Sequence, residues 1–210
     1  GTTHSDHVTM AVMVLDYFSA LFSVDETICP DPVIDLINTR VTDRMNVGLC
    51  ADFSDKEIAD ALFQIGPLKA PGPDGFPARF FQRNWEVMRE QVIAGVKEFF
   101  RTGIMPEGVN DTAIVLIPKV DNPERVSEFR PISLCNVIYK VVAKCLVNRL
   151  RPILDEIISP EQSAFVPGRL IADNALIAFE CFHYIQQEKD PEKIFCAYKL
   201  NLSKAYDRVD

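Results

Sequence analysis

The last part of the chain constrains the fold most, because an apolar run there leads directly into polar and aromatic residues at fixed spacing. Residues 194–200 are rich in β-branched and aromatic side chains and follow the turn-forming residues 189–192, so they predict a strand. Ser203 and the residues 204–205 then favour the start of a helix. This arrangement predicts a turn at the C-terminal end of a strand, where α/β folds commonly place reactive groups.

Residues 201–207 (Asn-Leu-Ser-Lys-Ala-Tyr-Asp) resemble the first palm motif of the reverse transcriptases of LINE-type (non-LTR) retrotransposons, Asp-x-x-Lys-Ala-(Phe/Tyr)-Asp. The resemblance continues upstream, in order, through residues 68–75, 117–119, 129–134 and 162–169. It implies a helix-rich α+β fold: the fingers region of a right-hand polymerase with a β-hairpin, followed by the first palm strand. This interpretation requires residues 194–200 to pair within a sheet.

The resemblance also divides the chain and assigns its site residues. It implies an acidic N-terminal extension or linker at 1–52, a fingers region at 53–193 and an incomplete palm at 194–210. Lys119 and Arg130 match the family's grip on the incoming nucleotide, and Tyr206 matches the aromatic gate against a ribose 2′-hydroxyl. The residues that match template-contacting segments are Gly72, Pro73, Asp74, Gly75, Gln162, Gly168 and Arg169.

One position departs from the motif. Asn201 stands where the family has its metal-binding aspartate, and the sequence contains no Asp-Asp pair, which the family's second palm motif would supply. At an effective dielectric constant of about 20, a carboxylate and a divalent ion ~4 Å apart attract each other by roughly 8 kcal/mol at most, and a neutral amide forfeits this attraction. We therefore expect weak or no binding of the family's Mg²⁺ and no primer extension by this chain alone.

The resemblance implies RNA-directed DNA synthesis, with an RNA template, a DNA primer and dNTPs as partners. Two alternatives stay open: a non-catalytic RNA-binding module or an inert relic that keeps the fingers fold, and an unrelated α/β domain with a structural role. Without the resemblance, residues 69–77 would be a plain connector, because prolines and glycines there limit backbone hydrogen bonding.

The charge of the chain is unevenly distributed. The net charge is −8, but residues 1–63 carry 3 basic and 11 acidic side chains, which alone give −8, so residues 64–210 are neutral overall. Between Arg125 and Arg151 the chain has six basic residues and one acidic residue. This local excess could meet phosphates, and a solvated helix face would explain part of it equally well.

The remaining patterns predict mostly helices. Helices are expected at 8–24, at 54–65 after a capping box of Ser54 and Glu57, at 136–150 and at 172–187, and one or two helices closed by Gly103 are expected at 77–101. An irregular acidic segment is expected at 25–52, and a hairpin of strands at 112–117 and 129–134. The aromatic stripe of the 77–101 segment predicts core packing rather than base stacking. Asn136 is expected to cap its helix, and Lys119 and Arg130 to face each other across the mouth of the hairpin.

Composition favours a soluble intracellular protein of the cytoplasm or nucleus. No apolar run approaches the roughly 18 residues of a membrane span, and the six cysteines are widely spaced and never form Cys-x-x-Cys, as expected for reduced thiols. The chain begins with Gly1 rather than Met and ends inside a predicted helix, so we expect it to be a piece of a longer protein.

Overall fold

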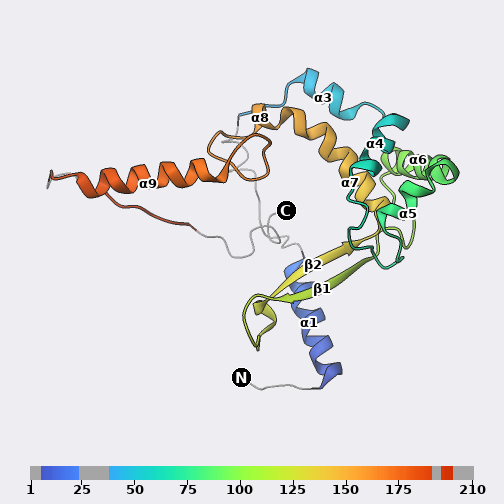
Figure 1. Ribbon diagram of the computed structural model, residues 1–210, viewed down its shortest axis with the longest axis horizontal. Helices are drawn as coiled ribbons and strands as arrows, with labels where there is room; N and C mark the ends of the chain where they lie inside the picture. The colour runs from blue at the N-terminus through green and yellow to red at the C-terminus, as the bar shows by residue number, and fades with distance from the viewer. Residues whose placement is uncertain (1–5, 24–37, 191–194, 201–210) are drawn as a thin grey trace. The chain divides into compact units, whose positions relative to one another are not determined.

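The structure is a computed structural model that describes residues 6–23, 38–190 and 195–200 (Figure 1). These residues form a helix-rich fold with one two-stranded antiparallel sheet, which confirms the predicted α+β class. The elements are α1 (His7–Leu21), α3 (Asp43–Cys50), α4 (Asp55–Gln64), α5 (Ala78–Arg83), α6 (Trp85–Thr102), β1 (Thr112–Pro118), η1 (Val126–Glu128), β2 (Phe129–Cys135), α7 (Val137–Leu150), η2 (Arg151–Ile153), α8 (Leu154–Ile157) and α9 (Ile171–Gln187).

The chain divides into two compact units. The first unit contains the described residues 6–23, 38, 118–130, 172–190 and 195–200, and the second contains residues 39–117 and 131–171. In the first unit, α1 forms as predicted; Phe18 is buried, and its ring contacts those of Tyr17 and Phe22. In the described ranges no helix combines the length and hydropathy that a membrane crossing requires.

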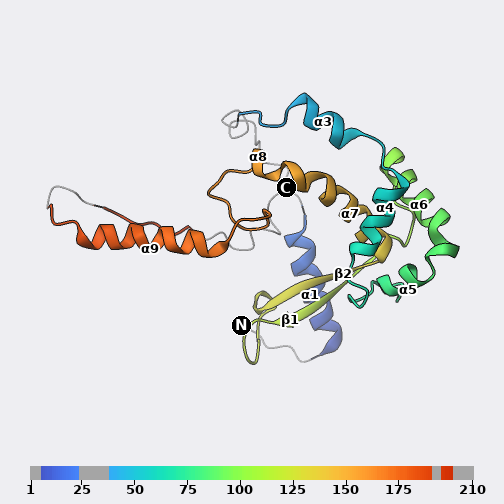
Figure 2. The same ribbon diagram turned by 45° about the horizontal axis from the view of Figure 1, so that its top comes forward.

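The core of the second unit forms where α4, α5 and α6 gather beside α7 (Figures 1 and 2). Each helix contributes residues at helical spacing that exclude water from this centre, and removal of apolar area from water is the main favourable term in folding. The buried core residues are Phe53, Ile58, Ala61, Leu62, Ala78, Phe81, Val92, Val96, Val137, Val141, Val142 and Cys145.

Local capping signals fix the ends of the central helices, as the sequence predicts. Ser54 Oγ accepts a hydrogen bond from Glu57 N at 3.3 Å, and a carboxylate oxygen of Glu57 accepts one from Ser54 N at 2.9 Å. The two bonds satisfy amides at the first turn of α4 that have no partner within the helix. Gly103 follows α6 and adopts the left-handed conformation (φ 72°) that ends this helix.

Two predictions about secondary structure are wrong within the described residues. The 25–52 segment is not irregular throughout, because α3 forms at Asp43–Cys50. Thr42 Oγ1 accepts a hydrogen bond from Met45 N at 3.3 Å, and Met45 Sδ accepts one from Thr42 N at 3.5 Å. Methionine replaces the usual Glu or Gln of this cap, which hides the signal in the sequence.

The strand predicted at 194–200 is also absent at residues 195–200, which have no regular secondary structure. A strand needs neighbouring strands to pair its backbone groups, and in the ranges that the structure describes β1 and β2 pair only with each other. The sheet pairing that the palm interpretation requires is therefore not present there. The family assignment must rest on other observations.

The aromatic stripe at 77–101 is only partly buried. Phe81 belongs to the core, whereas Phe80, its neighbour, is 37% exposed. Ala78 and Phe81, three residues apart, form the core side of α5, so the neighbouring Phe80 lies off that side. The prediction that Phe80 packs in the core is thus wrong.

Candidate nucleotide and template site

The two predicted nucleotide-binding cations, Lys119 and Arg130, lie near the loop end of the hairpin. Lys119 N donates a hydrogen bond to Glu128 O at 2.8 Å, which places residues 119 and 128 directly opposite each other. Glu128 ends the 3-10 turn η1, and Arg130 follows two residues later as the second residue of β2, so both cations lie at the loop end of the hairpin. Both Lys119 and Arg130 are exposed.

A carboxylate orders the loop between the two cations. An oxygen of Glu128 accepts hydrogen bonds from Glu124 N at 2.8 Å and Arg125 N at 3.1 Å, and these bonds lower the pKa of Glu128. The carboxylate thus has backbone partners, and Lys119 Nζ donates instead to Ser127 O at 3.1 Å. The ammonium group keeps further donors for a ligand, because it carries three.

The loop at 69–75 is clamped to the start of α7. The predicted cap Asn136 does occupy the N-cap position, but its side chain forms no cap hydrogen bond. Instead Oδ1 accepts from Asp74 N at 3.2 Å, and Nδ2 donates to the carbonyls of Gly108 at 2.9 Å and Val109 at 3.3 Å. Asn136 is only 3% exposed, so it holds two loops together from the inside.

Two further contacts fix the same loop. Lys140, one turn along α7, donates from Nζ to Ala70 O at 2.7 Å. Gly72 lies so close to the backbone of Cys135 and Asn136 that a side chain would not fit. The close approach that glycine permits at this position is therefore used within the chain itself. The loop of predicted template contacts is rigid, while Pro73, Asp74 and Gly75 are exposed along it.

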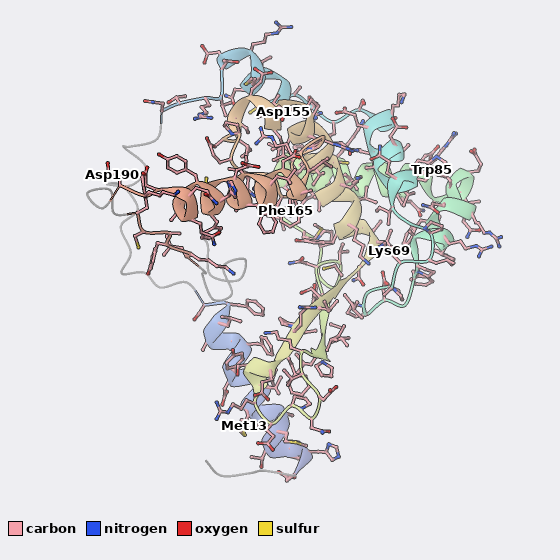
Figure 3. All side chains as sticks on the ribbon, turned by 60° about the vertical axis from the view of Figure 1, so that its left-hand side comes forward. Met13, Lys69, Trp85, Asp155, Phe165 and Asp190 are labelled. Carbon is pink, nitrogen blue, oxygen red and sulfur yellow. The ribbon has the colours of Figure 1, made fainter. Side chains whose placement is uncertain are left out.

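The second predicted template segment, 162–169, is organised by Arg169. Its guanidinium donates to Asp155 Oδ1 at 3.1 and 3.2 Å and to the carbonyls of Ile158, Ser159 and Gln162 (Figure 3 labels Asp155). The side chain is 17% exposed and uses its donors within the chain. Arg169 thus holds this loop in place, a role for which the sequence carries no local signal.

The same loop presents an aromatic side chain that the sequence pattern does not single out. Phe165 is 95% exposed and has φ 65°, a left-handed conformation that is uncommon for a bulky residue (Figure 3). Gly168 (φ 81°) supplies the second left-handed position, and Val166 is buried as an anchor. The loop therefore has a defined shape with its phenyl ring outward.

The comparisons with known proteins agree on one family. Residues 117–210, which include the hairpin end and the 162–169 loop, match the family described as reverse transcriptase (RNA-dependent DNA polymerase). The chain is 30% identical over 217 aligned residues to the "Transposon TX1 uncharacterized 149 kDa protein" of Xenopus laevis, across 100% of this chain and 16% of that protein. It is 28% identical over 146 residues to the "Retrovirus-related Pol polyprotein from type-2 retrotransposable element R2DM" of Drosophila melanogaster, across 70% of this chain and 13% of that protein. The chain belongs to the LINE-type reverse transcriptases.

This reverse transcriptase segment spans only a small part of the proteins that it matches, 16% and 13% of their lengths. The segment that resembles the first palm motif, with Asn201, Tyr206 and Asp207, lies outside the described residues. Within the described ranges, no group of three or more His, Cys, Asp or Glu residues could hold a metal ion. In the sequence, the neutral Asn201 stands where the family's motif has a metal-binding carboxylate.

Not every cation of the basic stretch 125–151 is available to phosphate. Arg149, with a side chain 12% exposed, pairs with Glu57 Oε1 at 2.9 Å. Its guanidinium carbon lies 3.4 Å from the centroid of the Phe53 ring, and the group also donates to the carbonyls of Leu49, Ala51 and Asp52. In this reverse transcriptase segment Arg149 is a structural residue that joins α7 to the start of α4.

The ion pair predicts how stability depends on pH. Hydrogen bonding from Arg149, assisted by Ser54, lowers the pKa of Glu57 from 4.5 to about 2. A carboxyl group with a lowered pKa stabilises the fold above its unfolded value of 4.5, and this contribution is lost as the pH falls towards about 2. We expect the urea midpoint of the chain to fall across this window more steeply than that of Glu57→Gln.

The control for this measurement is Glu90→Gln, which removes the same charge from an exposed position of α6. Its midpoint should follow the unsubstituted chain at every pH. If Glu57→Gln instead shows the same acid dependence as the unsubstituted chain, the Glu57–Arg149 pair does not govern this transition.

Proposed function

We propose that the chain supplies the fingers region and the start of the palm of a LINE-type reverse transcriptase, where it binds the RNA template and the incoming dNTP. In this proposal residues 53–193 form the fingers, residues 194–210 begin the palm, and residues 1–52 are an extension or linker. The main support for the proposal is that Lys119 and Arg130 are both exposed at the loop end of the hairpin, where Lys119 N bonds to Glu128 O, inside the segment that matches the family.

The chemistry of nucleotidyl transfer explains why this placement matters. The triphosphate must be neutralised and held while a 3′-hydroxyl attacks its α-phosphate, and positioned cations contribute much of that stabilisation. An arginine can grip phosphate oxygens with two parallel hydrogen bonds, and a lysine acts as a mobile point charge. Lys119 and Arg130 provide one of each.

The substitution at Asn201 favours a second candidate function, in which the chain binds RNA without catalysing synthesis. The family draws on Mg²⁺ for catalysis, and the neutral amide of Asn201 cannot supply the negative charge that the aspartate of the motif provides. Both candidates keep the template loops and differ only in whether nucleotide is consumed. We propose that the 210-residue chain by itself does not incorporate dNTPs.

The nucleotide grip can be tested by fluorescence titration of the chain with an N-methylanthraniloyl derivative of dGTP. Because charge-assisted hydrogen bonds are worth about 1.5–3 kcal/mol each, Lys119→Ala and Arg130→Ala should each weaken binding about tenfold or more. The matched control is Arg125→Ala, which removes an exposed cation from the same loop and should leave the affinity within about twofold. Equal losses in all three variants would show that only net charge matters and would contradict the assignment.

A further inference from the structure

Four residues at and before α5 form one exposed face, which we call the α5 face: Phe76, Arg79, Phe80 and Arg83. Arg79, Phe80 and Arg83 belong to α5, where residues three and four apart share one side, and Phe76 precedes the helix and contacts Phe80. Ala78 and Phe81 point the opposite way into the core. The α5 face therefore alternates aromatic rings with guanidinium groups.

The two rings of the α5 face are exposed and adjacent. Phe76 is 45% exposed and Phe80 is 37% exposed, and their centroids are 4.6 Å apart with planes inclined at 35°. Phe80 also meets the buried Phe81 edge-on at 5.4 Å, which fixes its orientation. Exposed flat rings held at a fixed angle can accept an unstacked base, since every base has a π-face.

The charge of the α5 face is positive in a chain of net charge −8. Between Gly66 and Trp85 the sequence has three basic residues and one acidic residue. The two acidic residues nearest in sequence have other partners. Asp74 Oδ1 accepts a hydrogen bond from Phe76 N at 2.9 Å, and Glu86 Oε2 lies 3.7 Å from Arg89 Nη1. In the ranges that the structure describes, the guanidinium groups of Arg79 and Arg83 form no ion pair.

The α5 face continues the clamped loop at 69–75 without interruption. Gly75 joins the loop to Phe76, and Arg79 N donates to Pro67 O at 3.1 Å, which ties the start of α5 to the end of the preceding turn. Asn136 and Lys140 hold the other side of the loop. A strand that contacts Pro73 to Gly75 would therefore meet the cations and rings of the α5 face directly beyond them.

We infer that the α5 face binds single-stranded RNA, with Arg79 and Arg83 on phosphates and Phe76 and Phe80 stacked on bases. The inference rests on the proposed function, because it extends the template path from the 69–75 loop onto α5. Alternating cations and aromatic rings are the combination that recognises a flexible, unpaired strand. A duplex offers phosphates but no free bases, so only the unpaired strand uses both parts of the face.

The test is fluorescence anisotropy of the chain with a labelled single-stranded RNA of about 12 nucleotides, at salt concentrations between about 50 and 200 mM. Arg79→Glu/Arg83→Glu should weaken binding about tenfold or more at the lower salt and reduce the salt slope by about 1.4, because two phosphate contacts are lost. Phe76→Leu/Phe80→Leu should weaken binding about tenfold with an unchanged slope. Circular dichroism and urea midpoints confirm that each variant is folded.

The matched control is Lys56→Glu/Arg89→Glu, which reverses two exposed charges elsewhere on the same unit and should change the affinity less than about twofold. Duplex RNA and single-stranded DNA of the same sequence should compete more weakly than the single-stranded RNA. The inference is overturned if both α5-face variants bind like the unsubstituted chain, as they would if protein covers this face, or if the unsubstituted chain does not bind the RNA. Nucleotide binding by Lys119 and Arg130 is measured separately, so its result can stand while this inference fails.

Discussion

Gly72→Ala is expected to destabilise the second unit by about 3 kcal/mol, a large loss for a substitution that adds one methyl group. A Cβ atom at residue 72 would lie 2.2 Å from Asn136 Oδ1, 2.4 Å from Asn136 N and 2.5 Å from the carbonyl carbon of Cys135. Two of these are backbone atoms at the junction of β2 and α7, so no side-chain rotation can relieve the overlap. Urea unfolding measures the loss.

The control for this substitution is Gly95→Ala in α6. A Cβ there meets nothing within 4 Å, and alanine favours a helix interior over glycine by about 0.5–1 kcal/mol, so this variant should be slightly more stable. Hydrogen exchange of the Asp74 amide should also accelerate in Gly72→Ala, because that amide loses its bond to Asn136. A Gly72→Ala chain as stable as the unsubstituted one would contradict the tight packing of Gly72 against Cys135 and Asn136.

Short-range signals in the sequence predicted most of the helices correctly. The Ser54 and Glu57 spacing gave the start of α4, Gly103 ended α6, and two β-rich runs formed the predicted hairpin. In each case the interacting groups are close in sequence, so the pattern itself contains both partners. The first palm motif also pointed to the family that the comparisons show.

Contacts between distant parts of the chain could not be predicted in this way. Asn136 looked like a helix cap, but its partner Asp74 is 62 residues away, and the partner of Arg149 is Glu57, 92 residues away. The exposure of Phe80 depends on which side of the short helix α5 meets the core, and the apolar pattern of the segment does not specify that side. The strand expected at 194–200 required neighbouring strands to pair with, and the pattern of one segment cannot specify such neighbours.

Asn201→Asp is expected to produce the largest change in activity. The substitution belongs in a longer protein that contains this chain together with the rest of a reverse transcriptase domain. A negative charge near a divalent ion is worth roughly 8 kcal/mol at most, and even a quarter of this, if it lowers the barrier, accelerates synthesis more than about tenfold. The control Asn46→Asp introduces the same charge at an exposed position of α3 and should have no effect.

The most direct test of the account is primer extension by that longer protein on an RNA template, with Asn201 and with Asn201→Asp, beside the 210-residue chain. We expect little product with Asn201, at least about tenfold faster synthesis with Asn201→Asp, and no incorporation by the 210-residue chain. Equal rates for the two longer proteins would contradict the role given to Asn201, and incorporation of dNTPs by the 210-residue chain would contradict its inactivity.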